Sequence, residues 1–198
     1  MTDRIGYKVI VVGDPNVGKT SLTYRFCEGL PLGHSIITVG VDLRLKMILL
    51  DDQLVTLQIW DTAGMERHDS MVQSYYRKAH AVVIMYDVTN RQSFDNLQYW
   101  LTECGRFASS DIVKVMVGNK CEEGAVRAVS KSEAQRFADD NEMPLFETSA
   151  KLESEVENIE TIFRTIAHKL LHERNIRISD CVILQERPME DELANCVC

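Results

Sequence analysis

The sequence lacks any apolar run of the ~18 residues that would suggest a membrane span. Its first residues, MTDRIGYKVIVVG, hold only a short apolar stretch, which predicts a core strand rather than a secretory signal. Positive charge is also scarce, with 22 Lys and Arg against 30 Asp and Glu and a net charge of −8. Because affinity for nucleic acid depends on clustered Lys and Arg, we expect no nucleic-acid partner.

Paired cysteines of the C-x-x-C type are missing as well. Four of the six cysteines (Cys27, Cys104, Cys121 and Cys181) stand singly, so no cysteine pair suggests a zinc site. Without a secretory signal we expect reduced thiols in the cytosol. There is no G-x-S-x-G, no internal repeat and no low-complexity tract, and the five histidines form no nucleophile–base arrangement.

What is present is the composition of one ordinary folded domain, with 198 residues, 45% hydrophobic and 26% charged. Continuous apolar runs at 7–13, 81–88 and 112–118 are typical of strands buried on both faces. The segments 41–49 and 54–60 alternate in polarity around Asp51 and Asp52, which predicts an antiparallel hairpin at a sheet edge.

Helical patterns follow most of these strands. We expect helices over 18–29, 93–108, 131–141 and 154–172, and a short strand at 144–147. Strands that alternate with helices predict an α/β fold, here a mostly parallel six-stranded sheet with one antiparallel edge strand and helices on both faces. We assign residues 1–174 to this domain and 175–198 to a flexible tail, because periodicity ends after Arg174.

Residues 13–20, GDPNVGKT, fit the pattern G-x-x-x-x-G-K-[ST]. Glycines let backbone amides approach phosphate oxygens, Lys19 supplies a cation, and Thr20 offers a hydroxyl to Mg²⁺. The alternative is a Gly-rich turn without a ligand. We favour the phosphate loop, because the motif follows a predicted strand and opens a predicted helix whose positive end points to the same place.

Two further residues are candidates for the metal. Asp61 ends an apolar strand, where its carboxylate could reach Mg²⁺ through water. Taken alone, such an Asp would more readily cap the start of a helix, but the phosphate loop upstream favours the metal. Thr38 precedes a strand, and its chemistry alone leaves metal binding and an ordinary strand residue equally open.

Taken together, the motifs resemble those of Ras-like GTPases, and specifically the Rab branch, over residues 7–172. The resemblance implies a small-GTPase G-domain fold, monomeric, with GTP or GDP and Mg²⁺ bound. The stretches SMVQSYYR and FADDNEMPLFETSA are most similar to a Golgi-associated Rab subgroup. The motifs that carry the resemblance are the phosphate loop, TVGVD (38–42), LQIWDTAG (57–64), SYYR (74–77), YDVTN-x-x-SF (86–94), GNKC (118–121) and ETSAK (147–151).

The resemblance also implies a role for each matching residue. Two segments, about 31–43 and 64–78, would order on GTP and loosen after hydrolysis. Asn119 and Lys120 would otherwise pass for a polar turn after a strand. The residues that would contact the phosphates are Asn16, Val17, Gly18, Lys19, Thr20 and Ser21, with Gly64 at the γ-phosphate. Those on the guanine side would be Asn119, Lys120, Glu122, Ser149, Ala150 and Lys151. Mg²⁺ would be bound by Thr20 and Asp61 and, only with GTP, by Thr38.

Three residues depart from the family pattern. Met65 stands where a Gln usually orients the attacking water, and a thioether offers no good donor or acceptor for it. Glu122 replaces the guanine-reading Asp, which predicts retained guanine preference with lower affinity. Pro31 replaces a frequent aromatic that covers guanine, which predicts faster exchange; Pro15 in the phosphate loop is also unusual.

The sequence ends NCVC, which is not a C-a-a-X box because Asn195 is fourth from the end. The C-x-C ending resembles the dual geranylgeranylation signal of Rab proteins, so Cys196 and Cys198 would each carry a lipid. Two lipid chains anchor stably without a basic patch, which suits the acidic tail. The alternative is a pair of incidental thiols in a disordered end.

The leading hypothesis is a membrane-recruited GTPase that regulates vesicle traffic on the cytoplasmic face of an internal membrane, by resemblance the Golgi, and cycles through the cytosol. Its expected partners are an exchange factor, a GTPase-activating protein, effectors at 31–43 and 64–78, a prenylation escort and a GDP-dissociation inhibitor. The second hypothesis is a constitutively GTP-bound module that recruits effectors without turnover. A P-loop kinase or ATPase is a third, against which GNKC and ETSAK argue.

Overall fold

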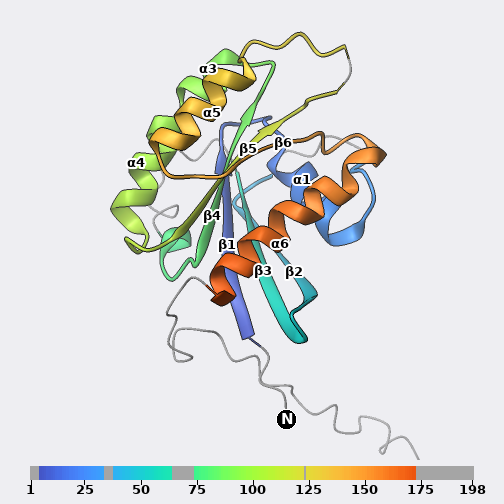
Figure 1. The fold of residues 1–198 in the computed structure, drawn as a ribbon, viewed down its shortest axis with the longest axis vertical. Coiled ribbons are helices and arrows are strands. Elements are labelled where there is room, and N and C mark those ends of the chain that lie inside the picture. The colour runs from blue at the N-terminus through green and yellow to red at the C-terminus, as the bar shows by residue number, and fades with distance from the viewer. Residues whose placement is uncertain (1–4, 34–37, 64–73, 123, 173–198) are drawn as a thin grey trace, which may run out of the picture.

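The computed structural model describes residues 5–33, 38–63, 74–122 and 124–172, and these form the predicted α/β fold (Figure 1). Six strands make one sheet in the order β2-β3-β1-β4-β5-β6. All neighbouring strands are parallel except the pair β2 and β3 at one edge, as predicted. The strands are β1 (Ile5–Gly13), β2 (Val41–Leu50), β3 (Gln53–Thr62), β4 (Ala81–Asp87), β5 (Val113–Asn119) and β6 (Leu145–Glu147).

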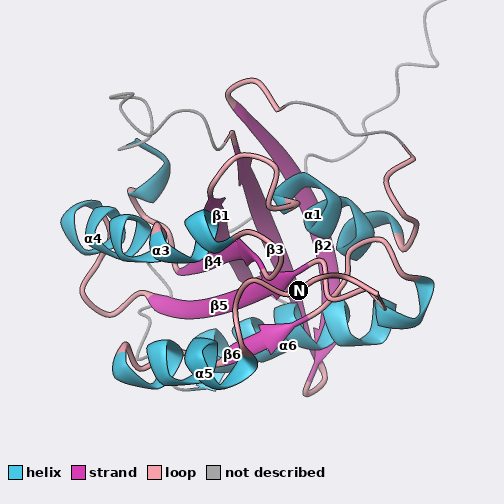
Figure 2. Ribbon diagram, turned by 90° about the horizontal axis from the view of Figure 1, so that it is seen from above, coloured by secondary structure: helices cyan, strands magenta, loops and turns pink. Residues whose placement is uncertain are grey.

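Helices cover both faces of the sheet, which separates two hydrophobic cores (Figure 2). On one face, α1 (Lys19–Glu28) and α6 (Val156–His172) pack together, and the rings of Phe26 and Phe163 stack with centroids 4.0 Å apart. The other face holds α3 (Arg91–Asp95), α4 (Leu97–Phe107) and α5 (Lys131–Asp140). A short 3-10 turn, Glu153–Glu155, precedes α6.

The central strands confirm the prediction from their unbroken apolar runs. Every residue of β4 is buried, because the strand has a neighbour on both sides and helices on both faces. Since β1, β3, β4 and β5 run parallel, their carboxyl ends meet at one edge of the sheet. Residues in the last positions of these strands and directly after them therefore gather there, which places the phosphate loop, Asp61 and Asn119 at the same end of the molecule.

One predicted helix was wrong in its extent. The expected single helix over 93–108 is two helices, separated at Asn96. The first begins at Arg91, because the Asn90 side chain accepts hydrogen bonds from the backbone N–H groups of Gln92 and Ser93 and so caps it. The break at Asn96 coincides with a distant contact, since its side-chain amide donates to Asp14 Oδ2 at 2.6 Å.

Strand β2 forms the open edge and shows a row of apolar side chains. Its inward residue Ile48 is 6% exposed, whereas the alternate residues point outward. Within the described part of the chain, no helix has both the length and the apolar character to cross a membrane. The outward residues of β2 are Leu43, Leu45, Met47 and Leu49, which are 49–60% exposed.

Candidate nucleotide-binding site

The phosphate loop joins β1 to α1 in a backbone conformation that requires glycine at two positions. Gly13 has a φ of 144°, and a Cβ there would collide with the Met85 carbonyl. Gly18 has a φ of 95° and no room for a side chain. Lys19 is 5% exposed, and its ammonium donates to the carbonyls of Gly13 and Asp14, at 2.9 Å each. The loop thus wraps around its own cation, at the positive end of α1.

A threonine pair and a carboxylate form the candidate metal corner. The hydroxyls of Thr20 and Thr38 lie 2.6 Å apart, although 18 residues separate them in the chain. Asp61 lies in β3 and is fully buried, which excludes the alternative that it begins a helix. Neither of its carboxylate oxygens has a hydrogen-bond partner among the described residues.

The electrostatics of this corner favour a cation. Burial raises the pKa of Asp61, and the nearby Thr20 hydroxyl and Lys19 ammonium only partly oppose that shift. A buried carboxylate without a donor is costly, and a bound cation would remove the cost. Oxygen atoms of Thr20, Thr38 and Asp61 form a donor set that suits Mg²⁺, which binds few protein oxygens and keeps several waters. The three residues therefore fit the ion that the sequence predicts.

Asn119 holds the phosphate loop to the loop after β6. Its side-chain amide donates to the Val17 carbonyl at 2.8 Å, and its side-chain oxygen accepts from the Ala150 N–H at 3.0 Å. A Cβ on Gly18 would collide with Asn119 Nδ2, so the Asn119 side chain can take this position only because residue 18 is glycine. The structure thus gives Asn119 a second role, as a structural brace, beside the guanine contact that the family resemblance implies.

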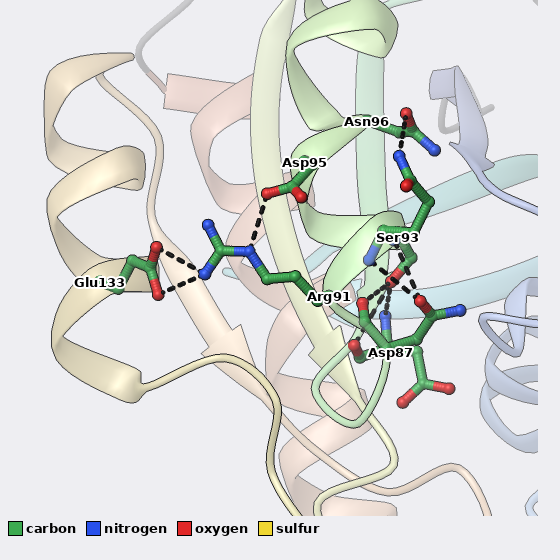
Figure 3. Close-up of polar contacts among 8 residues, drawn as sticks. Asp87, Arg91, Ser93, Asp95, Asn96 and Glu133 are labelled. Atoms are coloured by element: carbon green, nitrogen blue, oxygen red, sulfur yellow. Dashed lines mark hydrogen bonds and ion pairs between the residues drawn. The ribbon is translucent and has the colours of Figure 1, made fainter.

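Lys120 and Asp87 form the next part of the candidate guanine side. Lys120 has a φ of 69°, and its ammonium lies 2.7 Å from Asp87 Oδ2. The other oxygen, Oδ1, accepts from the Thr89 N–H and hydroxyl, while the Asp87 backbone N–H donates to Ser93 Oγ at 3.0 Å. Figure 3 shows Asp87 beside Ser93 at the start of α3. These contacts fix Asp87, which in turn fixes the lysine.

The loop at 149–151 is held from two directions. The Ser149 hydroxyl accepts from the backbone N–H groups of Lys151 and Leu152, which closes the loop on itself. Arg25 of α1 is 1% exposed and donates to the carbonyls of Ala150 and Lys151 at 3.3 and 2.9 Å. The loop therefore sits beside Asn119 in a fixed shape, and its support of a guanine ring stays a prediction.

Sequence reasoning missed a link between the phosphate loop and α4. The Trp100 indole donates to Asp14 Oδ1 at 2.9 Å, and Asn96 donates to Oδ2, so both carboxylate oxygens are occupied. Asp14 occupies a position that the motif leaves open to any residue, and 86 residues separate it from Trp100. An Asp in the loop together with a lone Trp on a later helix is too weak a signal to pair in advance.

The remaining predicted residues have the following places. Asn16 and Pro15 are exposed at the tip of the phosphate loop, Ser21 is half-buried in α1, and Pro31 is exposed just beyond that helix. Glu122 is half-buried after β5, on the chain that continues from Lys120. Gly64, Met65, Cys196 and Cys198 lie outside the described residues, so their predicted roles stay predictions.

The fold and this site are those of a phosphate-loop α/β domain of the G-domain type. Lys19 is buried next to a loop that contains two glycines with positive φ, and the buried carboxylate of Asp61 lies near the end of β3. The sequence matches the model of the Ras family over residues 8–172. The chain belongs to that family and, by its relatives, to the Rab branch.

Among the relatives, Ras-related protein Rab-33 of Caenorhabditis elegans is 46% identical over 176 residues, which cover 87% of this chain and 57% of that protein. Mouse Ras-related protein Rab-33A is also 46% identical over 176 residues, 88% of this chain and 74% of the relative. GTP-binding protein YPT1 of Saccharomyces cerevisiae is 43% identical over 164 residues, 83% of this chain and 78% of the relative. The chain thus spans between 57% and 78% of the length of these three proteins.

Proposed function

We propose that the protein is a guanine-nucleotide switch that binds GTP and GDP with Mg²⁺ and regulates vesicle traffic. The observation that carries the proposal is the metal corner, where the hydroxyl of Thr38 meets that of Thr20 close to the unpartnered carboxylate of Asp61. Thr38 lies in the segment 31–43, so a ligand at this corner ties the segment to the phosphate loop. Loss of the γ-phosphate would weaken the interactions that hold Thr38 at the metal corner.

The protein hydrolyses GTP slowly, because Met65 cannot orient the attacking water. Losing one such hydrogen bond costs on the order of 1–3 kcal/mol, roughly ten- to a hundred-fold in rate. Unaided small GTPases already turn over at only ~10⁻⁴ s⁻¹. Mg²⁺, when bound, neutralises developing phosphate charge. Lys19 supplies a further fixed cation, and Asp14, Trp100 and Asn119 hold the loop that presents it.

Glu122 tunes the guanine preference. Its carboxylate can accept from both guanine N–H groups, but its extra methylene changes the reach relative to Asp. Pro31 is exposed and offers no aromatic face for the guanine ring. We expect GTP and GDP to bind in preference to ATP, with weaker affinity and faster exchange than in relatives with the usual residues.

Partners and membrane attachment follow from the same proposal. Effectors bind over 31–43 and 64–78, and the exposed apolar row on β2 adjoins the first of these segments and enlarges the surface. Cys196 and Cys198 carry two prenyl groups, delivered by a prenylation escort and masked by a GDP-dissociation inhibitor. An exchange factor and an activating protein set the cycle, on the cytoplasmic face of an internal membrane, the Golgi.

The second candidate, a permanently GTP-bound module that only recruits effectors, also rests on Met65. Single-turnover hydrolysis of bound GTP separates the two, measured alone and with a Rab-type activating protein that brings both an arginine and a glutamine to the site. Slow turnover that the activator accelerates supports the switch. Absence of turnover in both conditions would establish the second candidate.

Nucleotide affinity tests the binding step independently. The full-length protein should retain GDP through purification and bind it in preference to ADP. Glu122→Asp should tighten GDP binding without changing ATP binding. ATP binding as tight as GTP would overturn the guanine assignment and favour the kinase or ATPase class.

A further inference from the structure

A cluster of three metal-ligating side chains lies at the end of the sheet opposite the phosphate loop. Asp51 is in the turn between β2 and β3, while His168 and His172 lie on the last turns of α6. Their candidate ligand atoms all lie within 4.8 Å of one another. Because β1 and β3 run parallel, with Ile5 beside Val55, the turn before β3 is far from the loop that follows β1. The cluster is therefore independent of the proposed nucleotide site.

The helix geometry brings the two imidazoles together. Residues four apart on a helix are neighbours on one face, and the rings of His168 and His172 have centroids 4.5 Å apart. His172 Nε2 lies 2.7 Å from Asp51 Oδ2, although 121 residues separate the two in the chain. An ion pair would account for the contact between Asp51 and His172, but it would not explain why His168 lies beside them.

The turn that carries Asp51 is fixed in place. Asp51 and Asp52 have φ values of 47° and 61°, the left-handed conformation of a two-residue hairpin turn. Arg164 of α6 donates to the Leu49 carbonyl at 3.1 and 3.3 Å, which holds the helix against the hairpin one turn before His168. The helix and the turn thus approach each other before any metal binds.

The surroundings also suit a cation. The cluster lies on the last described turns of α6, next to the β2–β3 turn. Asp52 adds a second negative charge in the same turn, while Arg164 and Lys169 of α6 line the groove beside His168. All three ligand residues are exposed, so a metal and its remaining water ligands can reach the cluster.

We propose that Asp51, His168 and His172 bind a transition-metal ion, preferentially Zn²⁺. Two imidazoles and one carboxylate suit Zn²⁺ better than Mg²⁺ or Ca²⁺, which prefer oxygen ligands only. Tetrahedral Zn²⁺ with bonds of 2.0–2.2 Å holds its ligand atoms about 3.3 Å apart, so small side-chain rotations from the present arrangement are enough. Three protein ligands leave the fourth position to water. The ion would join the end of α6 to the β2–β3 turn.

The test is an isothermal titration calorimetry experiment in which ZnCl₂ is added to the full-length, GDP-loaded protein in excess Mg²⁺. Cysteine thiolates also bind zinc, so the parent protein carries Cys181→Ser, Cys196→Ser and Cys198→Ser. We expect one Zn²⁺ per chain in this parent, loss of that binding in His168→Gln/His172→Gln, and at least about ten-fold weaker binding in Asp51→Asn. Asp52→Asn is the matched control, because it removes the same charge from the same turn, and it should bind as the parent does.

Two readouts keep the result specific. Zn²⁺ should raise the melting temperature of the parent and of Asp52→Asn, but not that of the double histidine variant. Co²⁺ in place of Zn²⁺ should give a visible spectrum without a thiolate charge-transfer band. Unchanged Zn²⁺ binding in the double histidine variant, or in Asp51→Asn, would overturn the three-ligand site, as would a thiolate band with Co²⁺.

Discussion

The indole of Trp100 in α4 donates a 2.9 Å hydrogen bond to the carboxylate of Asp14 in the phosphate loop. Both residues are buried, at 2% and 8% exposure, and the second carboxylate oxygen is bound by Asn96. The loop that would hold the phosphates is therefore attached to a helix on the opposite face of the sheet from α1. Its shape depends on this link as well as on its own glycines.

Replacing Trp100→Phe should weaken this attachment while it keeps most of the ring packing. The Asp14 carboxylate would lose a buried donor, which costs about 1–3 kcal/mol of unfolding free energy. We also expect faster GDP dissociation, since the loop is less firmly held. Urea unfolding and the release of a fluorescent GDP analogue measure the two effects.

Trp60→Phe is the matched control for this substitution. The Trp60 indole N–H is buried and has no hydrogen-bond partner among the described residues, so the change replaces the indole by a smaller ring and removes no hydrogen bond. GDP release should stay near the wild-type rate. If both variants release GDP equally fast, the indole–carboxylate bond has no special role.

Asn119→Ala should affect folding as well as binding. It leaves the Val17 carbonyl and the Ala150 N–H without their partner, each a loss of about 1–3 kcal/mol when the group remains buried. Urea unfolding of the nucleotide-free protein isolates this brace from any guanine contact. Asn141→Ala, which removes a single bond to Phe137 at the end of α5, should cost less. Equal stability of the two variants would reduce Asn119 to a ligand contact alone.

Met65→Gln should raise intrinsic GTP hydrolysis roughly ten- to a hundred-fold, because an amide can orient the water that a thioether cannot. Single-turnover phosphate release from the GTP-loaded protein measures the rate. Met71→Gln makes the same chemical change six residues further along and should leave the rate unchanged. A wild-type rate in Met65→Gln would mean that another departure from the family pattern limits the chemistry.

Lys8 predicts a pH dependence of stability. Burial lowers the pKa of Lys8 from 10.5 to about 8, although its ammonium lies 4.1 Å from the centre of the Trp60 ring and donates to the Arg77 carbonyl. Between about pH 8 and 10.5 the unfolded chain holds this proton and the folded chain does not. Stability therefore rises with pH through that window.

Replacing Lys8→Met removes the titrating group and isolates its effect from the cysteines, whose raised pKa values act in the opposite sense near the top of the range. The difference in unfolding free energy, wild type minus Lys8→Met, should increase from pH 7.5 to pH 10 in urea titrations. A constant difference across that range would show that the lysine stays charged in the folded protein.

Much of the fold was predictable because its signals are local. Strand β4 buries all seven of its residues, six of them an unbroken apolar run before Asp87, and α6 repeats its apolar side chains at helical spacing. The places of Lys19 and Asp61 were predictable for a similar reason, since Lys19 belongs to a motif that links a strand to a helix and Asp61 lies at the end of an apolar strand. The side chains then meet because parallel strands bring their ends to one edge.

The contacts that could not be predicted join residues far apart in sequence. Nothing near Asp14 indicates Trp100, and nothing near Asn119 indicates that it braces Val17, 102 residues away. The break at Asn96 was missed for the same reason, because the contact to Asp14 that coincides with it is tertiary. Local propensity favoured one continuous helix there.

The pairing of β2 with β3 has a mechanical consequence for the proposed switch. Val41 lies opposite Thr62, so the chain enters β2 and leaves β3 at the same point of the sheet. A shift of one residue along this ladder would turn every β2 side chain over and carry buried Ile48 into water. The two strands therefore cannot slide past each other by small steps. We therefore expect a partner bound at residues 41–43 to be coupled through β2 and β3 to Thr62 and Ala63, which directly precede the proposed second switch segment.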